Sequence, residues 1–357
     1  MSFLIFIVCI SILIFIHELG HFIAARRAGV TVEVFSLGFG PKLLTRKKGD
    51  TIYQLCAIPL GGYIKMAGDS RKECTGKSNE YLSSSCGHRA SIVVSGGILN
   101  YLLGFICFSV ALVFGIPDYS STVGTLLEGY PAQEAGLLPG DKIVSIDDKK
   151  ISLWGELITN IQDKNGQSVD IDLIRAGELL ELRVSTRLEE IDTVRGKVEI
   201  SFIGIGPGYL KYGIKDAVVV GAREYLKFTA FYYRALGDML TGKISLKKSA
   251  TGLIGIYKIT TNAASMGMGP LLNVLAIINL ALAIFNLLPF PILDGGHLLL
   301  IGIEKIRGKP ISIKIEDALN KLGITLLIFL LVFVTINDFV RFGLWDGMVV
   351  FFKALIK

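Results

Sequence analysis

The sequence predicts a polytopic α-helical membrane protein with about four transmembrane helices, a membrane-associated β-loop and an inserted α+β domain. Hydrophobic residues make up 51% of the 357 residues, and the mean hydropathy of +0.56 is too apolar for an ordinary soluble enzyme. Apolar runs of membrane-spanning length alternate with charged stretches. Between these runs, short alternating segments punctuated by glycine and proline are typical of strands and turns.

Four apolar runs are candidates for crossing a bilayer. The first two, Phe3–Ala25 and Ala90–Ile116, are long enough to span about 30 Å of hydrocarbon at about 1.5 Å per helical residue. The last two, Leu271–Leu288 and Ile324–Ile336 with its flanks, are shorter. We therefore expect four domains: residues 1–116 with the first two spans and the β-loop, residues 117–210 with the inserted domain, residues 211–270 with an amphipathic helical segment, and residues 271–357 with the last two spans and an amphipathic tail.

Charge predicts the topology. Residues 26–89 hold eleven Lys and Arg against five acids, so the positive-inside rule places this loop in the cytoplasm. The amino terminus and the inserted domain would then be extracytoplasmic. The net charge of +6 is accordingly a topology signal, and no basic stripe interleaved with aromatic residues indicates nucleic acid.

The first apolar run carries the chemistry, in the HExxH pattern His17-Glu18-Leu19-Gly20-His21. His17 and His21 lie four residues apart and project from one face of a helix, so two imidazoles can bind one zinc ion. Glu18 lies about 100° around the helix, where a carboxylate can serve as general base. Three ionisable groups within one turn of a transmembrane helix are costly unless they line a functional cavity.

A catalytic zinc site usually has three protein ligands, and Asp294 is the candidate for the third. It ends the third apolar run in a stretch where Pro289 and Pro291 break the helix and two glycines follow. Irregular backbone at membrane depth is tolerated only inside protein or beside water. The alternative, a simple interfacial helix start capped by Asp, leaves the zinc one ligand short.

Three further segments have weaker patterns. Residues 31–66 predict short strands and hairpins, although residues 38–41 alone could be only a turn. Residues 123–186 alternate short strands with a helix and predict a small α+β domain. Residues 216–240 mix aromatic residues with charges, which predicts an amphipathic helix on the membrane surface.

Taken together, the motifs resemble the site-2 protease family of intramembrane zinc metalloproteases, in particular its bacterial RseP-type branch. The resemblance covers nearly the whole chain. It depends on HELGH, on Gly38-Phe39-Gly40-Pro41, on Pro59-Leu60-Gly61-Gly62-Tyr63 with Lys65 and Met66, and on NLLPFPILDGGH from Asn286 to His297. HExxH alone is shared with many zinc proteases, whereas its combination with LDGG in a later span is highly specific.

The resemblance implies that His17, His21 and Asp294 bind Zn²⁺, that Glu18 is the general base, and that Asn286 holds the substrate backbone or oxyanion. It also implies that a β-loop containing Gly38, Phe39 and Gly40 lies beside the active site, where we expect a strand edge that pairs with substrate. The inserted domain resembles a single PDZ domain that could bind a peptide or a substrate ectodomain, with a rigid spacer as the alternative.

The same resemblance implies substrates and a location. The substrates would be single-pass membrane proteins such as an anti-sigma factor or signal-peptide remnants, cut within the bilayer of the bacterial cytoplasmic (inner) membrane, with the active site toward the cytoplasm. Two positions depart from many relatives: Ala281, and Ser95-Gly96-Gly97 ahead of Asn100. The competing hypothesis is a catalytically silent zinc-binding scaffold or PDZ adaptor.

Overall fold

The computed structural model describes residues 2–193, 196–245 and 251–343. The chain divides into two compact units: Met1–Ala111 with Ile214–Asp338, and Leu112–Gly213 with Phe339–Lys357. The amphipathic tail predicted after the last span falls on residues 344–357, which lie outside the described residues.

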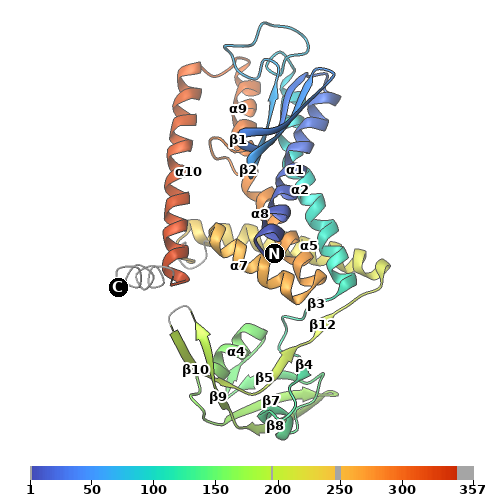
Figure 1. Cartoon of the computed structure of the whole chain (residues 1–357), viewed down its shortest axis with the longest axis vertical. Helices are drawn as coiled ribbons and strands as arrows, with labels where there is room; N and C mark the ends of the chain where they lie inside the picture. The colour runs from blue at the N-terminus through green and yellow to red at the C-terminus, as the bar shows by residue number, and fades with distance from the viewer. Residues whose placement is uncertain (1, 194–195, 246–250, 344–357) are drawn as a thin grey trace. The chain divides into compact units, whose positions relative to one another are not determined.

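Four helices among the described residues are long and apolar enough to cross a membrane, which confirms the predicted number of spans (Figure 1). They are α1 (Ser2–Arg27), α2 (Cys86–Phe114), α8 (Met268–Asn286) and α10 (Ile313–Arg341). Helices α1 and α10 extend beyond the predicted apolar runs at both ends, because polar residues continue a helix at the water interface, whereas α2 and α8 begin and end earlier than predicted. Only 6% of the most apolar window of α10 is buried within the protein, so its apolar side chains are suited to contact lipid.

Three more helices of this unit are α5 (Ile214–Leu240), α7 (Leu253–Met266) and α9 (Asp294–Arg307). Helix α5 covers residues 216–240, for which the sequence predicts an amphipathic helix. Helix α7 begins against α10, where the fully buried carboxylate of Asp338 accepts hydrogen bonds from the backbone N–H groups of Gly252 and Gly255 at 3.1 and 3.0 Å. The carboxylate thus satisfies donors that a helix start leaves without intrahelical partners.

The predicted short strands and hairpins form one long, irregular hairpin of β1 (Val32–Lys48) and β2 (Thr51–Met66). Residues 42–48 pair antiparallel with residues 51–56, and residues 32–37 pair antiparallel with residues 62–66. Residues 34–37 also pair with residues 52–55, so the hairpin folds back on itself. Gly38 and Gly40, both with positive φ, lie between the two halves of β1. The hairpin packs on α1 through an aromatic cluster of Phe22, Phe35 and Tyr53.

The loop segments at one end of this unit contact one another. Arg89, at the start of α2, forms an ion pair with Glu304 of α9 at 2.6 Å and is only 5% exposed. Arg71, in the loop before α2, pairs with Glu316 near the start of α10 at 3.2 Å. The charge rule assigns residues 26–89 to the cytoplasmic side, and these ion pairs join that loop to α9 and to the start of α10.

The loop at residues 67–85 is organised around one carboxylate, that of Glu80. Its oxygens accept hydrogen bonds from the hydroxyl of Thr75 at 2.6 Å and from the backbone N–H groups of Thr75 and Gly76 at 2.8 and 2.9 Å. The Thr75 hydroxyl and these N–H groups lower the pKa of Glu80 to about 2. The ionised carboxylate therefore gives this irregular segment a fixed backbone path.

The second unit confirms the inserted α+β domain. A four-stranded antiparallel sheet has the order β6-β5-β7-β8, and three further strand pairs are β9 with β10, β4 with β11, and β3 with β12. Two-residue turns with positive φ at both positions join β5 to β6 and β7 to β8, as in type I′ hairpins. The strands are β3 (Ile116–Pro117), β4 (Val123–Leu126), β5 (Lys142–Ile146), β6 (Lys149–Lys150), β7 (Val169–Arg175), β8 (Glu178–Val184), β9 (Arg187–Thr193), β10 (Gly196–Phe202), β11 (Ile205–Pro207) and β12 (Tyr209–Leu210), and the helices are α3 (Pro131–Glu134) and α4 (Trp154–Gln162).

One apolar core holds this unit together. Most of its buried members come from β4, β5, β7 and β8 and from the helices α3 and α4, where Ala132 and Leu157 have no exposed surface. Because inward and outward residues alternate along β7, the sheet has one face on this core. The unit therefore has its own hydrophobic core, as an independent domain requires.

We predict that Glu80→Gln loosens the loop at residues 67–85, because it replaces an ionised acceptor with a neutral one. Backbone amides of Thr75 and Gly76 should exchange roughly tenfold faster in hydrogen exchange. In the unchanged protein the folded-state pKa lies below the ordinary Glu value of about 4.3. Protection should therefore be complete above that value and be lost as the pH falls toward about 2. Glu73→Gln, at a more exposed acid of the same loop, is the control; equal protection in both variants would contradict the assignment.

Candidate metal centre

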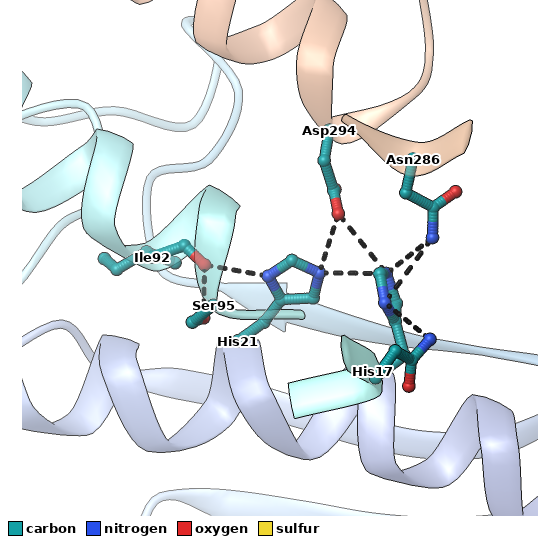
Figure 2. Close-up of polar contacts among 7 residues, drawn as sticks. His17, His21, Ile92, Ser95, Asn286 and Asp294 are labelled. Carbon is teal, nitrogen blue, oxygen red and sulfur yellow. Dashed lines mark hydrogen bonds and ion pairs between the residues drawn. The ribbon is translucent and has the colours of Figure 1, made fainter. Parts of the chain in front are cut away.

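The candidate site begins on α1, where His17 and His21 lie one helical turn apart. Their rings are nearly perpendicular, with centroids 4.7 Å apart, and both point toward Asp294 (Figure 2). The space for the two imidazole rings is limited by the close approach of α2. A Cβ at Gly20 would come within 2.5 Å of the Ser95 carbonyl oxygen, and a Cβ at Gly96 would come within 2.4 Å of His21 Nε2. The two helices can therefore cross at the site only because both positions are glycine.

Asp294 reaches the site from an irregular turn between α8 and α9. Ile292 has φ of 80°, a left-handed conformation that is strained for a β-branched residue. Asp294 is the first residue of α9, and no side chain caps that helix. Glycines follow because a Cβ at Gly295 or Gly296 would lie 2.2 Å from a carbonyl oxygen of the turn. The carboxylate is thus held by a tightly folded turn and is not used as a helix cap.

The three candidate ligand atoms form a small triangle (Figure 2). The Nε2 atoms of His17 and His21 are 3.2 Å apart, and Oδ2 of Asp294 lies 3.3 Å from the first and 3.5 Å from the second. Three ligands bound to one tetrahedral zinc at about 2.0–2.1 Å are roughly 3.3 Å apart from one another. The buried Oδ2 receives no hydrogen bond from a described residue. The donor set and spacing therefore fit a metal ion such as zinc.

A cavity of about 560 Å³ opens onto this triangle. Glu18 is half-buried and lines the cavity with the three candidate ligands. Asn286, the last residue of α8, also lines it, and its Nδ2 lies 3.4 Å from His17 Nε2. The cavity is thus lined by all five residues predicted for the metal site and for substrate binding near it: His17, Glu18, His21, Asn286 and Asp294. It leaves space beside them for a substrate segment.

Among the described residues of the β-loop, those that line the cavity belong to β2, and not to the segment of β1 singled out from the sequence. Gly62 and Tyr63 of β2 line the cavity, whereas Gly38, Phe39 and Gly40 of β1 are not among the described lining residues. Phe39 instead stacks on Tyr63, with ring centroids 6.1 Å apart and an interplanar angle of 8°. The predicted segment therefore supports the strand that faces the cavity.

Sequence reasoning did not assign α2 a part in the site. His21 Nδ1 lies 2.8 Å from the Ile92 carbonyl oxygen, and Asn100 lies 3.4 Å from His17 Nδ1 through its Nδ2. Together with Gly96, these residues are spaced four apart on one face of α2. The available signal was a run of small residues followed by an asparagine inside an apolar span, which is typical of close helix packing and of a polar function.

Comparison with known proteins gives consistent results. A protein of Clostridium acetobutylicum, named provisionally as a zinc metalloprotease, is 35% identical over 94% of this chain and 96% of its own length. A similarly named protein of Agrobacterium fabrum is 32% identical over 93% and 94%. The zinc metalloprotease RasP of Shouchella clausii is 27% identical over 93% and 97%.

Among solved structures, the PDZ domain of an SdrC-like protein from Listeria monocytogenes is 22% identical over 26% of this chain and 90% of that domain, with a TM-score of 0.21. The sequence pattern of peptidase family M50 matches residues 5–330, which include both ends of the candidate site. The chain belongs to peptidase family M50.

Proposed function

We propose that this protein is an intramembrane zinc endopeptidase that hydrolyses peptide bonds within the transmembrane segments of single-pass membrane proteins. The observation that carries the proposal is the triangle of His17 Nε2, His21 Nε2 and Asp294 Oδ2, with sides of 3.2–3.5 Å, on helices that include a membrane-spanning one. The names of the relatives RasP and the other zinc metalloproteases support zinc as the metal.

In this mechanism His17, His21 and Asp294 would hold the ion, which would supply Lewis-acid activation of water and of the scissile carbonyl. Glu18 lines the same cavity and accepts the proton of the attacking water. The water oxygen forms a bond to the carbonyl carbon, and the carbon–nitrogen bond then breaks. Glu18 returns its proton to the leaving amine, so that the carboxylate is regenerated.

Asn286 is placed to stabilise the reacting peptide. Its amide lines the cavity beside His17 and is half-buried, so its Nδ2–H can donate to a substrate carbonyl oxygen on which negative charge develops. The amide is neutral and does not compete for the metal. We assign it to substrate binding.

A substrate helix must unwind before its carbonyl groups can be attacked, because each is protected by an intrahelical hydrogen bond. The β1–β2 hairpin offers strand edges beside the cavity, and β2 presents Gly62 and Tyr63 to it. An extended substrate segment can pair there by β-augmentation. Gly38, Phe39 and Gly40 belong to this substrate-binding element because Phe39 stacks on Tyr63.

The wider assignment follows from the membrane helices and the inserted domain. We infer a bacterial cytoplasmic (inner) membrane protein, because its helices are long and apolar enough to span a membrane and its named relatives are bacterial. The charge asymmetry between its loops supports an extracytoplasmic amino terminus and PDZ-like domain, with the site toward the cytoplasm. The PDZ-like domain would receive a peptide or substrate ectodomain, and anti-sigma factors and signal-peptide remnants fit the single-pass class.

We predict that Glu18→Gln lowers cleavage of a reconstituted single-pass substrate by about 10²- to 10⁴-fold while zinc content is unchanged, because the variant keeps the ligands and loses the base. Product formation and zinc per protein are measured on the same samples. Equal cleavage by both proteins would disprove the role of Glu18. Zinc binding by the unchanged protein without cleavage of any substrate would favour the scaffold hypothesis.

We predict that Gly96→Ala weakens zinc binding about tenfold or more, because the added methyl group would lie 2.4 Å from His21 Nε2 and 2.8 Å from His17 Cε1. Gly97→Ala is the matched control on the next residue of α2, where the closest atom would be 3.4 Å away, an ordinary contact. Competition with a zinc chelator gives both affinities. If both variants bind zinc equally well, the close approach of α2 does not position the ligands.

A further inference from the structure

Asn100, on α2, is a buried neighbour of His17 and is not among the described residues that line the cavity. It is 1% exposed, and its Nδ2 is 3.4 Å from His17 Nδ1. Asn286 is at a similar distance from His17, but among the described residues that line the cavity Asn286 is present and Asn100 is not. A substrate can therefore reach the Asn286 amide, whereas Asn100 is placed to act only on the imidazole.

The ligand triangle determines which imidazole nitrogen carries the proton. This step depends on the proposed function, since it takes the Nε2 atoms of His17 and His21 as metal ligands. A neutral imidazole that binds metal through Nε2 keeps its proton on Nδ1, and that N–H needs an acceptor. For His21 the acceptor is the carbonyl oxygen of Ile92, 2.8 Å from Nδ1. The corresponding nitrogen of His17 lies 3.4 Å from Nδ2 of Asn100 and 3.5 Å from Nδ2 of Asn286. Of the two amides, that of Asn286 faces the cavity, so Asn100 is the one left to serve the imidazole.

Rotating the Asn100 amide by half a turn would give hydrogen-bond partners both to His17 Nδ1–H and to the amide oxygen. In its present orientation the NH₂ group, a donor, faces a ring nitrogen that must also be a donor. Its Oδ1 is buried and receives no hydrogen bond from a described residue. Amide oxygen and nitrogen occupy nearly identical shapes and are assigned from the hydrogen-bond network. Rotation by half a turn gives His17 Nδ1–H its acceptor and gives Oδ1 its donor.

We propose that Asn100 is a positioning residue, whose Oδ1 accepts the Nδ1–H of His17 and holds that imidazole with Nε2 toward the metal position. Helix α2 then orients both histidines from one face: Ile92 holds His21, Asn100 holds His17, and Gly96 between them leaves room for the rings. The acceptor on each ring sets the tautomer and raises the basicity of the ligand nitrogen.

The test measures zinc affinity of the full-length protein by chelator competition, so that it does not depend on cleavage. Asn100→Leu removes the acceptor with little change of volume and should weaken zinc binding about 10- to 100-fold. Asn100→Asp restores an acceptor for Nδ1–H and should bind zinc within a few-fold of the unchanged protein. Asn279→Leu is the matched control, because Asn279 is also fully buried in a membrane helix and, among the described residues, its side chain hydrogen-bonds only to the Leu275 carbonyl oxygen of its own helix.

Zinc affinity that is unchanged in Asn100→Leu, or lost equally in Asn100→Leu and Asn100→Asp, would overturn the proposal. Nitrogen-15 NMR gives a second readout on the zinc-loaded protein, which has four histidines. We expect the His17 proton on Nδ1, and a proton on Nε2 would also overturn the proposal. If the unchanged protein binds zinc tightly but cleaves no substrate, the proposed function fails while the assignment of Asn100 stands.

Discussion

The structure depends on keeping two imidazole nitrogens and a carboxylate oxygen within 3.5 Å of one another in a membrane protein. Such an arrangement is unfavourable without a cation, because lone pairs face each other and the buried Oδ2 of Asp294 receives no hydrogen bond from the described residues. A bound metal ion turns this repulsion into coordination. The glycines of α1, α2 and the turn before α9, and the strained φ of Ile292, serve to hold the three ligand atoms together.

The elements around the three ligand atoms differ in what they contact. Helix α2 contacts both histidines, for example through the Ile92 carbonyl oxygen and His21. Strand β2 and Asn286 face the space where substrate would lie. Helix α10 has apolar side chains exposed along most of its length. Ion pairs between Arg89 and Glu304, and between Arg71 and Glu316, connect the loops at one end of the same unit. The inserted α+β unit has its own core, so its folding does not depend on the residues of the candidate site.

Much of this was predictable from the sequence because local rules apply to it. Hydrophobicity and length predicted the four spans, and a spacing of four residues placed His17 and His21 on one helix face. Asp294 was a candidate because a catalytic zinc site needs a third ligand, and the structure brings it to the two histidines. The role of α2 was not predicted. It depends on where α1 and α2 cross and on which of their side chains meet there, and the residue spacing within one helix does not reveal either. The β-loop shows the same limit: Gly38, Phe39 and Gly40 were recognisable, but the register that brings Gly62 and Tyr63 to the cavity is a tertiary property.

The central claim is that one zinc ion is bound by two imidazoles and one carboxylate. X-ray absorption at the zinc edge of the purified full-length protein tests it most directly, because zinc–nitrogen and zinc–oxygen distances of about 2.0–2.1 Å differ from zinc–sulfur distances of about 2.3 Å. We predict a first shell of nitrogen and oxygen only, with the outer-shell pattern of two imidazoles, and the loss of that spectrum in Asp294→Ala. Sulfur in the first shell, drawn from any of the five free cysteines, or a spectrum unchanged by Asp294→Ala would contradict the account.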